Sequence, residues 1–422
     1  MSGPAAGTAS AATTTDVVCL GESMVTFLPS QPGRLADVPS FGRGIGGAES
    51  NVACALAAAG HRAAWVGRVG ADGFGDHLVE TIAGYGVDTS AVRRDPDRPT
   101  GIYFRTATDR GADTHEVAYY RAGSAASAMA PDNVPYEDLF AGRVLHLSGI
   151  TAALSADCLA LLRDLTAPRP GRPLVSFDVN HRPHLWRGAD ADASVLLELA
   201  RRADLVFVGE DEAEEAWGIV GADAVRAALP EPAVVVVKRG SAGATVFSGP
   251  RPTAFTRPRP TVSSGPRPAG NARAENAGDA ETATRDEMAE RNETAARDET
   301  AARDETAARD ETATAGGATG PGDTVTHVPA LRVDVVAAVG AGDAFAAGFL
   351  SATLRGLPVR DRARHGHLMA AAVLTVPGDL TDPPARAHAD RLAALDEDAW
   401  GTLRLGPGWT AADRAPQEVR TP

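Results

Sequence analysis

The chain has 422 residues, 44% of them hydrophobic, and a formal net charge of -14 at pH 7. This length allows one large α/β domain with an appendage, or two domains, with a full apolar core. The acidic balance argues against general nucleic-acid binding and against an anionic membrane surface. Cys19, Cys54 and Cys158 stand alone without metal-ligand spacing, so we expect reduced core residues rather than disulfides or a zinc site.

The N-terminal stretch 1–15 is rich in Ala, Thr, Ser and Gly and lacks the basic start and apolar core of a signal peptide. We expect a disordered leader and, since no stretch resembles a transmembrane span, a cytoplasmic protein. Asp16 to Leu28 alternates apolar and small residues, which predicts a first strand. Four glycines between Gly42 and Gly47 precede a helical run at 52–59, so a hydroxylated ligand can lie against the main chain there. Asn51 offers its amide to such a ligand or simply caps the helix.

A strand at 64–69 and a helix at 76–85 follow, joined by a turn whose glycines lack the GxGxxG spacing of a dinucleotide site. Gly101–Arg105 and Val117–Arg121 predict a hairpin with Tyr and Arg side chains on one face. That face suits an anionic, polyhydroxylated ligand, because Arg binds carboxylates bidentately. An ordinary half-buried hairpin gives the same pattern, and both interpretations stay open.

Strands and helices alternate after Arg143, with strands expected at 144–147, 174–178, 205–208 and 233–238 and helices at 155–165 and 191–202. Short Val/Leu strands alternating with amphipathic helices predict an α/β fold with a doubly wound, mostly parallel sheet. Ligands of such sheets bind at the carboxyl ends of the strands. The polar residues at these ends are Asp178, Asn180, Arg182, Glu210, Glu212, Lys238 and Gly240.

Residues 251–323 break this alternation with a Pro/Arg-rich start and a six-residue Arg-Asp-Glu-Thr repeat. A period of six builds no apolar helix face, so we expect a disordered, low-complexity insertion on a surface loop. A partner-binding role is the alternative. An Ala-rich helix is predicted at 365–376, and the Pro/Arg/Thr-rich segment 405–422 is predicted to be a disordered tail.

The stretch Val333–Thr353 predicts a strand, a tight turn at Gly340-Ala341-Gly342 and a helix that opens on Asp343. N–H groups at a helix start bind anions, and a carboxylate stands beside them. Such a corner can hold a phosphate while Asp343 deprotonates its acceptor. A turn with a capping Asp is the structural alternative.

With these segments in order, residues 16–400 resemble the PfkB-type, ribokinase-like carbohydrate kinases, apart from the insertion. Gly46–Asn51 (GGAESN) resembles the sugar-binding signature of that family, and Gly340–Asp343 (GAGD) resembles its second signature. The hairpin strands, together with His146–Ile150 and Phe177–Pro183, resemble the 2-keto-3-deoxygluconate kinases within the family.

The resemblance implies a ribokinase-like kinase domain at 16–404 with a small β lid at about 22–45 and 98–122, which often serves as a homodimer face. It implies ATP and Mg²⁺ as cofactors, and transfer of a phosphoryl group to the 6-hydroxyl of 2-keto-3-deoxygluconate. The residues that it assigns to the sugar acid are Gly47, Asn51, Tyr103, Tyr119, Arg121 and Arg182. Those that it assigns to the nucleotide are Lys238, Gly240, Gly243, Gly340 and Gly342.

By the same resemblance, Asp343 is the catalytic base, the N–H groups of Gly340, Ala341 and Gly342 stabilise the transferring phosphoryl group, and Glu212 is an outer-sphere magnesium carboxylate. Two positions depart from the family pattern: Ala337-Ala338 replaces a usual Asp-Thr or Asp-Pro, and Gly209 replaces an Asn. A kinase for another sugar, such as fructose or ribose, and a sugar-binding scaffold with degraded catalysis are the alternatives.

Overall fold

The computed structural model describes residues 15–31, 33–106, 116–186, 192–249 and 322–411. The chain divides into two units, Met1–Thr256 with Gly316–Pro422 and Arg257–Ala315, and every described residue belongs to the first. The predicted leader up to residue 14, most of the predicted insertion and the end of the predicted tail therefore lie outside the described residues. Among the described helices, none is long and apolar enough to cross a membrane.

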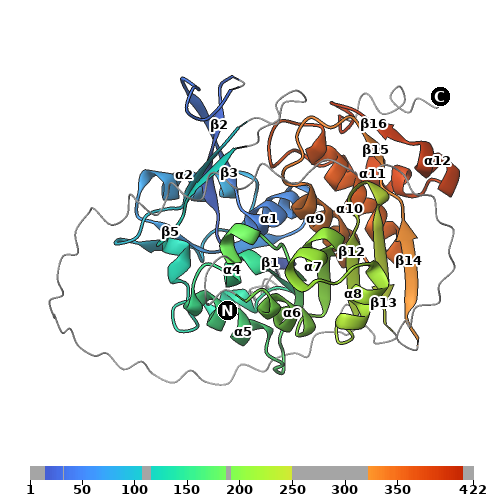
Figure 1. Ribbon diagram of the computed structural model, residues 1–422, viewed down its shortest axis with the longest axis horizontal. Helices are drawn as coiled ribbons and strands as arrows, with labels where there is room; N and C mark the ends of the chain where they lie inside the picture. Colours follow the sequence, from blue (N-terminus) through green and yellow to red (C-terminus); the bar gives the residue numbers. More distant parts are fainter. Residues whose placement is uncertain (1–14, 32, 107–115, 187–191, 250–321, 412–422) are drawn as a thin grey trace, which may run out of the picture. The chain divides into compact units, whose positions relative to one another are not determined.

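The central sheet has the strand order β14-β13-β12-β11-β10-β9-β1-β4 (Figure 1). Neighbours from β12 to β4 are parallel, whereas β13 and β14 are antiparallel. The strands are β1 (Val17–Leu20), β4 (Ala63–Val66), β9 (Val144–Ser148), β10 (Leu174–Asp178), β11 (Leu205–Gly209), β12 (Val234–Lys238), β13 (Ala244–Ser248) and β14 (Thr324–Val328). The predicted mostly parallel sheet is confirmed.

Alternate residues of these strands feed two apolar cores, one on each face of the sheet. Val234 and Val236 belong to one core, and Val235 and Val237 belong to the other. Burial on both faces explains why the strands read as continuous apolar runs in the sequence.

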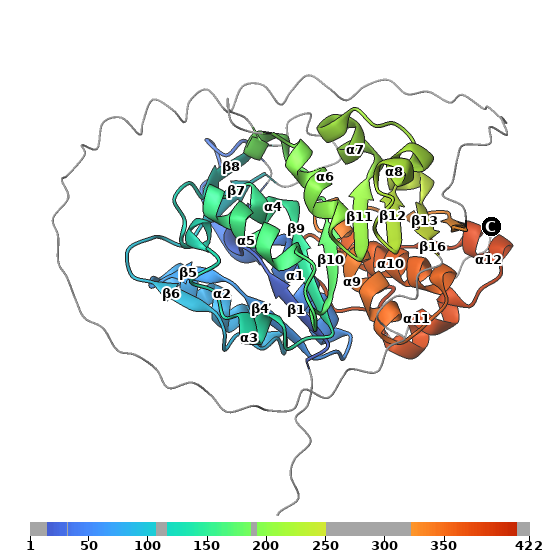
Figure 2. The same ribbon diagram turned by 90° about the horizontal axis from the view of Figure 1, so that it is seen from below.

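Helices cover both faces, with α6–α8 and α9–α11 on opposite sides of β10–β12 (Figure 2). The helices that contribute to the first core are α1 (Ala48–Ala58), α2 (Gly73–Gly84), α9 (Ala341–Leu354), α10 (Val359–Leu374), α11 (Arg386–Ala393) and α12 (Glu397–Thr402). Those of the second core are α3 (Tyr136–Leu139), α4 (Gly149–Ala152), α5 (Ala156–Thr166), α6 (Ser194–Arg201), α7 (Glu210–Trp217) and α8 (Ala222–Ala228).

A separate four-stranded sheet, which we call the lid, has the order β3-β2-β7-β8. Its strands are β2 (Met24–Pro29), β3 (Phe41–Gly46), β7 (Ile102–Arg105) and β8 (Val117–Tyr120). β7 and β8 are antiparallel with Tyr103 opposite Tyr119, which confirms the hairpin and places both rings on one face. Two small sheets pair β5 (Arg68–Gly70) with β6 (Arg93–Asp95) and β15 (Arg332–Val333) with β16 (Arg404–Leu405).

Three strand predictions were wrong. The predicted strands 16–28 and 64–69 each divide in two, β1 with β2 and β4 with β5, and the halves lie in different sheets. The strand expected before the Gly340 turn is only β15. Beyond it Val335 and Val336 are 39% exposed, and the Val336 N–H donates to the carbonyl of Leu374 at the end of α10 rather than to a strand. Alternation of apolar residues shows that a segment is extended, but it does not show where the chain leaves one sheet and enters another.

Segment ends also differ from prediction. α1, α2, α9 and α10 begin two to six residues earlier than expected, because small or polar residues in a first turn carry no apolar period. The predicted tail begins too early, since Leu405 and Trp409 are buried at 4% and 2% exposure. The predicted insertion ends too late, because Asp323 forms a buried ion pair with Arg226 at 2.7 Å.

Candidate active site

Six parallel strands end at the same edge of the central sheet, and polar side chains gather there. Asp178 is the last residue of β10, and Lys238 is the last residue of β12. Lys238 Nζ donates to both carboxylate oxygens of Asp178, at 3.0 and 3.1 Å. The first turn of α9 lies against this pair, since a side chain at Gly342 would meet Lys238 Nζ at 3.6 Å.

Asp343 is held by two amides in the first turn of α9. Asn51 Nδ2 on α1 donates to its Oδ2 at 2.9 Å, and Asn180 Nδ2 donates to its Oδ1 at 3.4 Å. Burial raises the pKa of Asp343 to about 6, against the opposing effect of the Asn51 hydrogen bond. A carboxylate with a pKa just below neutrality is deprotonated at pH 7 and still basic enough to accept a proton.

The amide oxygens of Asn51 and Asn180 are buried and have no hydrogen-bond partner among the described residues. Asn180 also has φ 43, the only positive φ of a non-glycine residue in the described ranges. Unpaired buried acceptors are costly, and unusual backbone conformations concentrate at functional sites. The two oxygens therefore suit a ligand that brings hydroxyl donors.

The turn before α9 is built for close backbone approach. Gly340 caps α9 with φ 78, and a Cβ there would lie 2.6 Å from the carbonyl oxygen of Asp379. The following N–H groups open a helix of 14 residues, whose N-terminus carries partial positive charge. Burial lowers the pKa of Lys238, but Asp178 and Glu212 outweigh it and hold that pKa above its ordinary value. Lys238 stays cationic beside this turn.

The lid hairpin presents the predicted aromatic face, with the Tyr103 and Tyr119 rings stacked at 5.4 Å and Tyr119 stacked on His184 at 4.8 Å. Both hairpin arginines already have carboxylate partners. Arg121 pairs with Glu22, and Arg105 pairs with Asp379.

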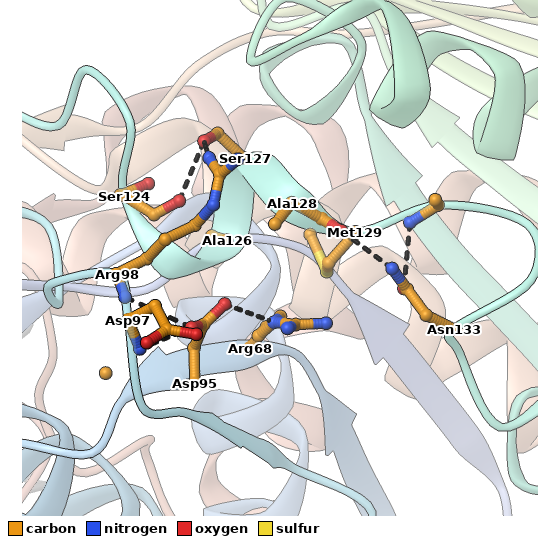
Figure 3. Close-up of polar contacts among 12 residues, drawn as sticks. Arg68, Asp95, Asp97, Arg98, Ser124, Ala126, Ser127, Ala128, Met129 and Asn133 are labelled. Atoms are coloured by element: carbon orange, nitrogen blue, oxygen red, sulfur yellow. Dashed lines mark hydrogen bonds and ion pairs between the residues drawn. The ribbon is translucent and has the colours of Figure 1, made fainter. Parts of the chain in front are cut away.

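The loop that follows Arg121 is fixed by a series of polar contacts (Figure 3). Asp95 accepts from Arg68 Nε at 2.8 Å and from the Arg98 N–H at 3.1 Å. Arg98 then donates to Ser127 Oγ at 3.3 Å, and Ser127 donates to the Ser124 carbonyl at 2.7 Å. Ser124 Oγ in turn donates to Glu22 at 2.6 Å. Glu22, and with it Arg121, is thereby held in place.

Two further predicted residues have structural contacts that explain their identity. A Cβ at Gly47 would lie 2.4 Å from the Glu22 carbonyl oxygen, so only glycine fits at the start of α1. A Cβ at Gly243 would lie 2.2 Å from the Val328 carbonyl oxygen, where φ is +107°. Gly240, with φ +52°, faces open space, which leaves room for a ligand beside the turn η3 (Gly240–Ala242).

Arg182 and Glu212 lie next to each other, with Arg182 Nη1 at 3.5 Å from Glu212 Oε1. The Arg182 side chain is 44% exposed, so it is free to meet a ligand. Glu212 Oε2 accepts the Gly209 N–H at 2.7 Å and caps α7. Among the described residues no group of three or more His, Cys, Asp or Glu is placed to hold a metal ion.

Sequence reasoning placed Asp178, Asn180 and Lys238 together at the strand ends, but it predicted neither the Lys238–Asp178 ion pair nor the hydrogen bond from Asn180 to Asp343. It assigned no role to Glu22 or Asp379. Asp379 follows α10 in a segment without motif or periodicity, so no sequence signal distinguished it. Glu22 stands beside Gly21 in the expected first strand, and only the turn from β1 into the lid shows its role.

A protein-family model described as "pfkB family carbohydrate kinase" matches this chain over residues 14–264 and 306–386. The chain is 29% identical over 378 residues to a 2-dehydro-3-deoxygluconokinase of Bacillus subtilis (strain 168), covering 88% of this chain and 93% of the relative. It is 33% identical over 234 residues to a 2-dehydro-3-deoxygluconokinase of Thermoproteus tenax, covering 55% and 71%.

A fructokinase-1 of Zea mays is also 33% identical, over 204 residues that cover 48% of this chain and 62% of the relative. Among solved structures, a PfkB protein from Polaromonas sp. JS666 superposes with a TM-score of 0.64 at 27% identity, covering 89% of this chain and 99% of that one.

Proposed function

The chain belongs to the pfkB family of carbohydrate kinases, which are ATP-dependent sugar phosphotransferases, and from this we propose that it phosphorylates a sugar acid. The substrate that we propose is 2-keto-3-deoxygluconate, also called 2-dehydro-3-deoxygluconate, and the product is its 6-phosphate. Two relatives bear the name of that activity. The observation that carries the choice of an acid is the guanidinium of Arg182, which is 44% exposed and stands two residues before the His184 ring that stacks on Tyr119.

In the proposed reaction, Asp343 takes the proton of the terminal hydroxyl as that oxygen attacks the γ-phosphorus of ATP. The amide donors of Asn51 and Asn180 orient the carboxylate, and their unpaired oxygens accept sugar hydroxyls. N–H groups of Gly340 to Gly342 and the Lys238 ammonium stabilise the negative charge of the transferring phosphoryl group.

Magnesium neutralises charge on the ATP phosphates when it is bound. Glu212, through water, is the residue we propose to hold it, and the Gly240 turn is proposed to admit the nucleotide. The lid covers the sugar and excludes water, which limits ATP hydrolysis. Self-association through the lid and a cytoplasmic location stay predictions.

A panel of sugars in a coupled ADP-release assay tests the substrate. We expect kcat/KM for 2-keto-3-deoxygluconate to exceed that for fructose and ribose by a factor of about 10² or more, because only the acid brings a carboxylate to the exposed Arg182 guanidinium. Arg182→Ala should lower kcat/KM for the acid by about 30- to 100-fold and leave the neutral sugars nearly unchanged. Equal turnover of fructose, the substrate named by the maize relative, would contradict the acid assignment.

Asp343→Ala separates an enzyme from a scaffold in the same assay. Loss of the general base should reduce turnover by a factor of about 10² or more while ATP binding persists. Undiminished turnover of this variant would show that another group accepts the proton.

A further inference from the structure

Two ion pairs fasten the lid hairpin to the rest of the fold. Arg121, after β8, pairs with Glu22, which follows the central strand β1. Arg105, the last residue of β7, pairs with Asp379 at 2.5 Å, and their side chains are 3% and 6% exposed. The mechanism above uses neither residue of this second pair.

Asp379 touches both glycine signatures as well as the lid. Its carbonyl oxygen lies 2.6 Å from where a Cβ at Gly340 would stand, and its Oδ2 lies 2.9 Å from the same position at Gly46. Tyr103 on β7 donates its hydroxyl to Asp379 Oδ2 at 3.1 Å. The backbone of Asp379 is thus the surface against which Gly340 adopts its left-handed conformation.

The side chain of Asp379 depends on the lid for its charge partner. Burial raises the pKa of Asp379, whereas Arg105 and Tyr103 act in the opposite direction. Arg105 Nε is buried and without a hydrogen-bond partner among the described residues, and Arg105 Nη2 donates to Asp379 Oδ1. Removing either member leaves a buried group unpaired, which is unfavourable.

We propose that Arg105 is a positioning residue for phosphoryl transfer: from the lid it holds Asp379, whose backbone fixes Gly340 and the N–H groups at the start of α9. The proposal rests on the proposed function, because it takes those N–H groups as the site of phosphoryl stabilisation. Through this link, the position of the lid and the geometry of the turn at Gly340 depend on each other.

The test compares Arg105→Gln and Arg105→Lys with Arg226→Gln. Arg226 also forms a buried ion pair, with Asp323, but it joins α8 to the start of β14, away from the site. At saturating ATP and sugar, Arg105→Gln should lower kcat by about 10- to 100-fold, because a small displacement of stabilising groups is costly in the transition state. KM for ATP should stay within about threefold. Arg105→Lys should have a kcat between those of Arg105→Gln and wild type. Arg226→Gln should lower Tm and leave kcat unchanged.

Hydrogen–deuterium exchange gives a readout that needs no turnover. Amides of residues 340–343 should exchange faster in Arg105→Gln than in wild type, and at the wild-type rate in Arg226→Gln. If the wild-type protein turns over no sugar, the proposed function fails, yet this comparison still tests the link from Arg105 to Gly340.

A double-mutant cycle with Asp379→Asn completes the test. If Arg105 acts through Asp379, Arg105→Gln should add almost nothing to the loss caused by Asp379→Asn. Fully additive losses, or exchange rates and kcat that match those of Arg226→Gln, would overturn the proposal.

Discussion

At the scale of single residues, the chemistry of the site depends on what surrounds Asp343. A carboxylate at a helix start is an ordinary cap, and the sequence left that alternative open. The structure gives Asp343 two amide donors, Asn51 and Asn180, and burial raises its pKa to about 6. These surroundings favour the interpretation of Asp343 as a base, since a simple cap needs neither amide.

The pH profile of kcat/KM checks this environment. A general base must be deprotonated, so activity should fall as pH decreases through about 6. The Asn51 hydrogen bond lowers the pKa of Asp343, so Asn51→Ala should move the acidic limb to higher pH. We expect a loss of about tenfold or more at pH 6 and a smaller one at pH 8.

Asn133→Ala is the matched control for this experiment. Asn133 Nδ2 donates to the Ala128 carbonyl, as Asn51 Nδ2 donates to Asp343, and Asn133 Oδ1 accepts from the Ala130 N–H (Figure 3). Its acidic limb should coincide with that of wild type. An unmoved limb in Asn51→Ala would assign the ionisation to another group.

At the scale of elements, α1 is anchored by a buried carboxyl group in its first turn. Glu49 is fully buried, and its Oε1 accepts from the backbone and hydroxyl of Ser148 and from the hydroxyl of Thr151. A Cβ at Gly21 would lie 2.1 Å from the Glu49 carboxyl carbon, so Gly21 makes room for it. The same helix carries Asn51, so this anchor also places an amide of the site.

Glu49 should make the stability of the fold depend on pH. Burial raises its pKa from 4.5 to about 7, so between these values the folded chain keeps a proton that the unfolded chain has released. The free energy of unfolding should therefore fall as pH rises through this window, by on the order of 3 kcal/mol. Glu49→Gln stays neutral and still accepts from Ser148 and Thr151, so it should lose this dependence.

Thermal melts at pH 5 and pH 8 measure the effect. The difference in Tm between Glu49→Gln and wild type should favour the variant more at pH 8 than at pH 5. Glu137→Gln, at an exposed position on α3, controls for the loss of one carboxylate. A Tm lowered equally at both pH values would mean that Glu49 contributes through its packing alone.

At the scale of the whole molecule, the low-complexity repeat joins two paired strands. Ser248 of β13 lies opposite Thr324 of β14, so the ends of the intervening segment are neighbours in the sheet. The family model leaves residues 265–305 unmatched. The strands of the central sheet and the residues assigned to the site all lie outside that stretch of the sequence.

Deleting residues 254–320 and joining the ends directly should leave Tm within a few degrees and kcat within about twofold of wild type. Extending the deletion to 254–323 removes Asp323 and leaves the Arg226 guanidinium buried without its carboxylate. That longer deletion should lower Tm by several degrees. Loss of activity in the shorter deletion would show that the repeat has a structural or catalytic role.

The sequence by itself determined the elements whose signal is local. Valine-rich strands alternating with amphipathic helices predicted the doubly wound sheet, and the paired Tyr/Arg strands predicted the hairpin. Both predictions depend on the pattern of apolar and turn-forming residues within a short segment. The two glycine signatures predicted where backbone must approach closely, and Gly47 and Gly340 do so.

Only the tertiary structure decided which distant residues meet. The partnerships of Asn51 with Asp343, of Lys238 with Asp178 and of Arg105 with Asp379 join residues 292, 60 and 274 positions apart. Such contacts follow from the order of parallel strands and from the turn that carries β1 into the lid, neither of which leaves a periodic pattern in the chain. Asp379 is the clearest example. In the sequence it is a single carboxylate after a helix, and only its contacts with Arg105, Gly46 and Gly340 suggest a role.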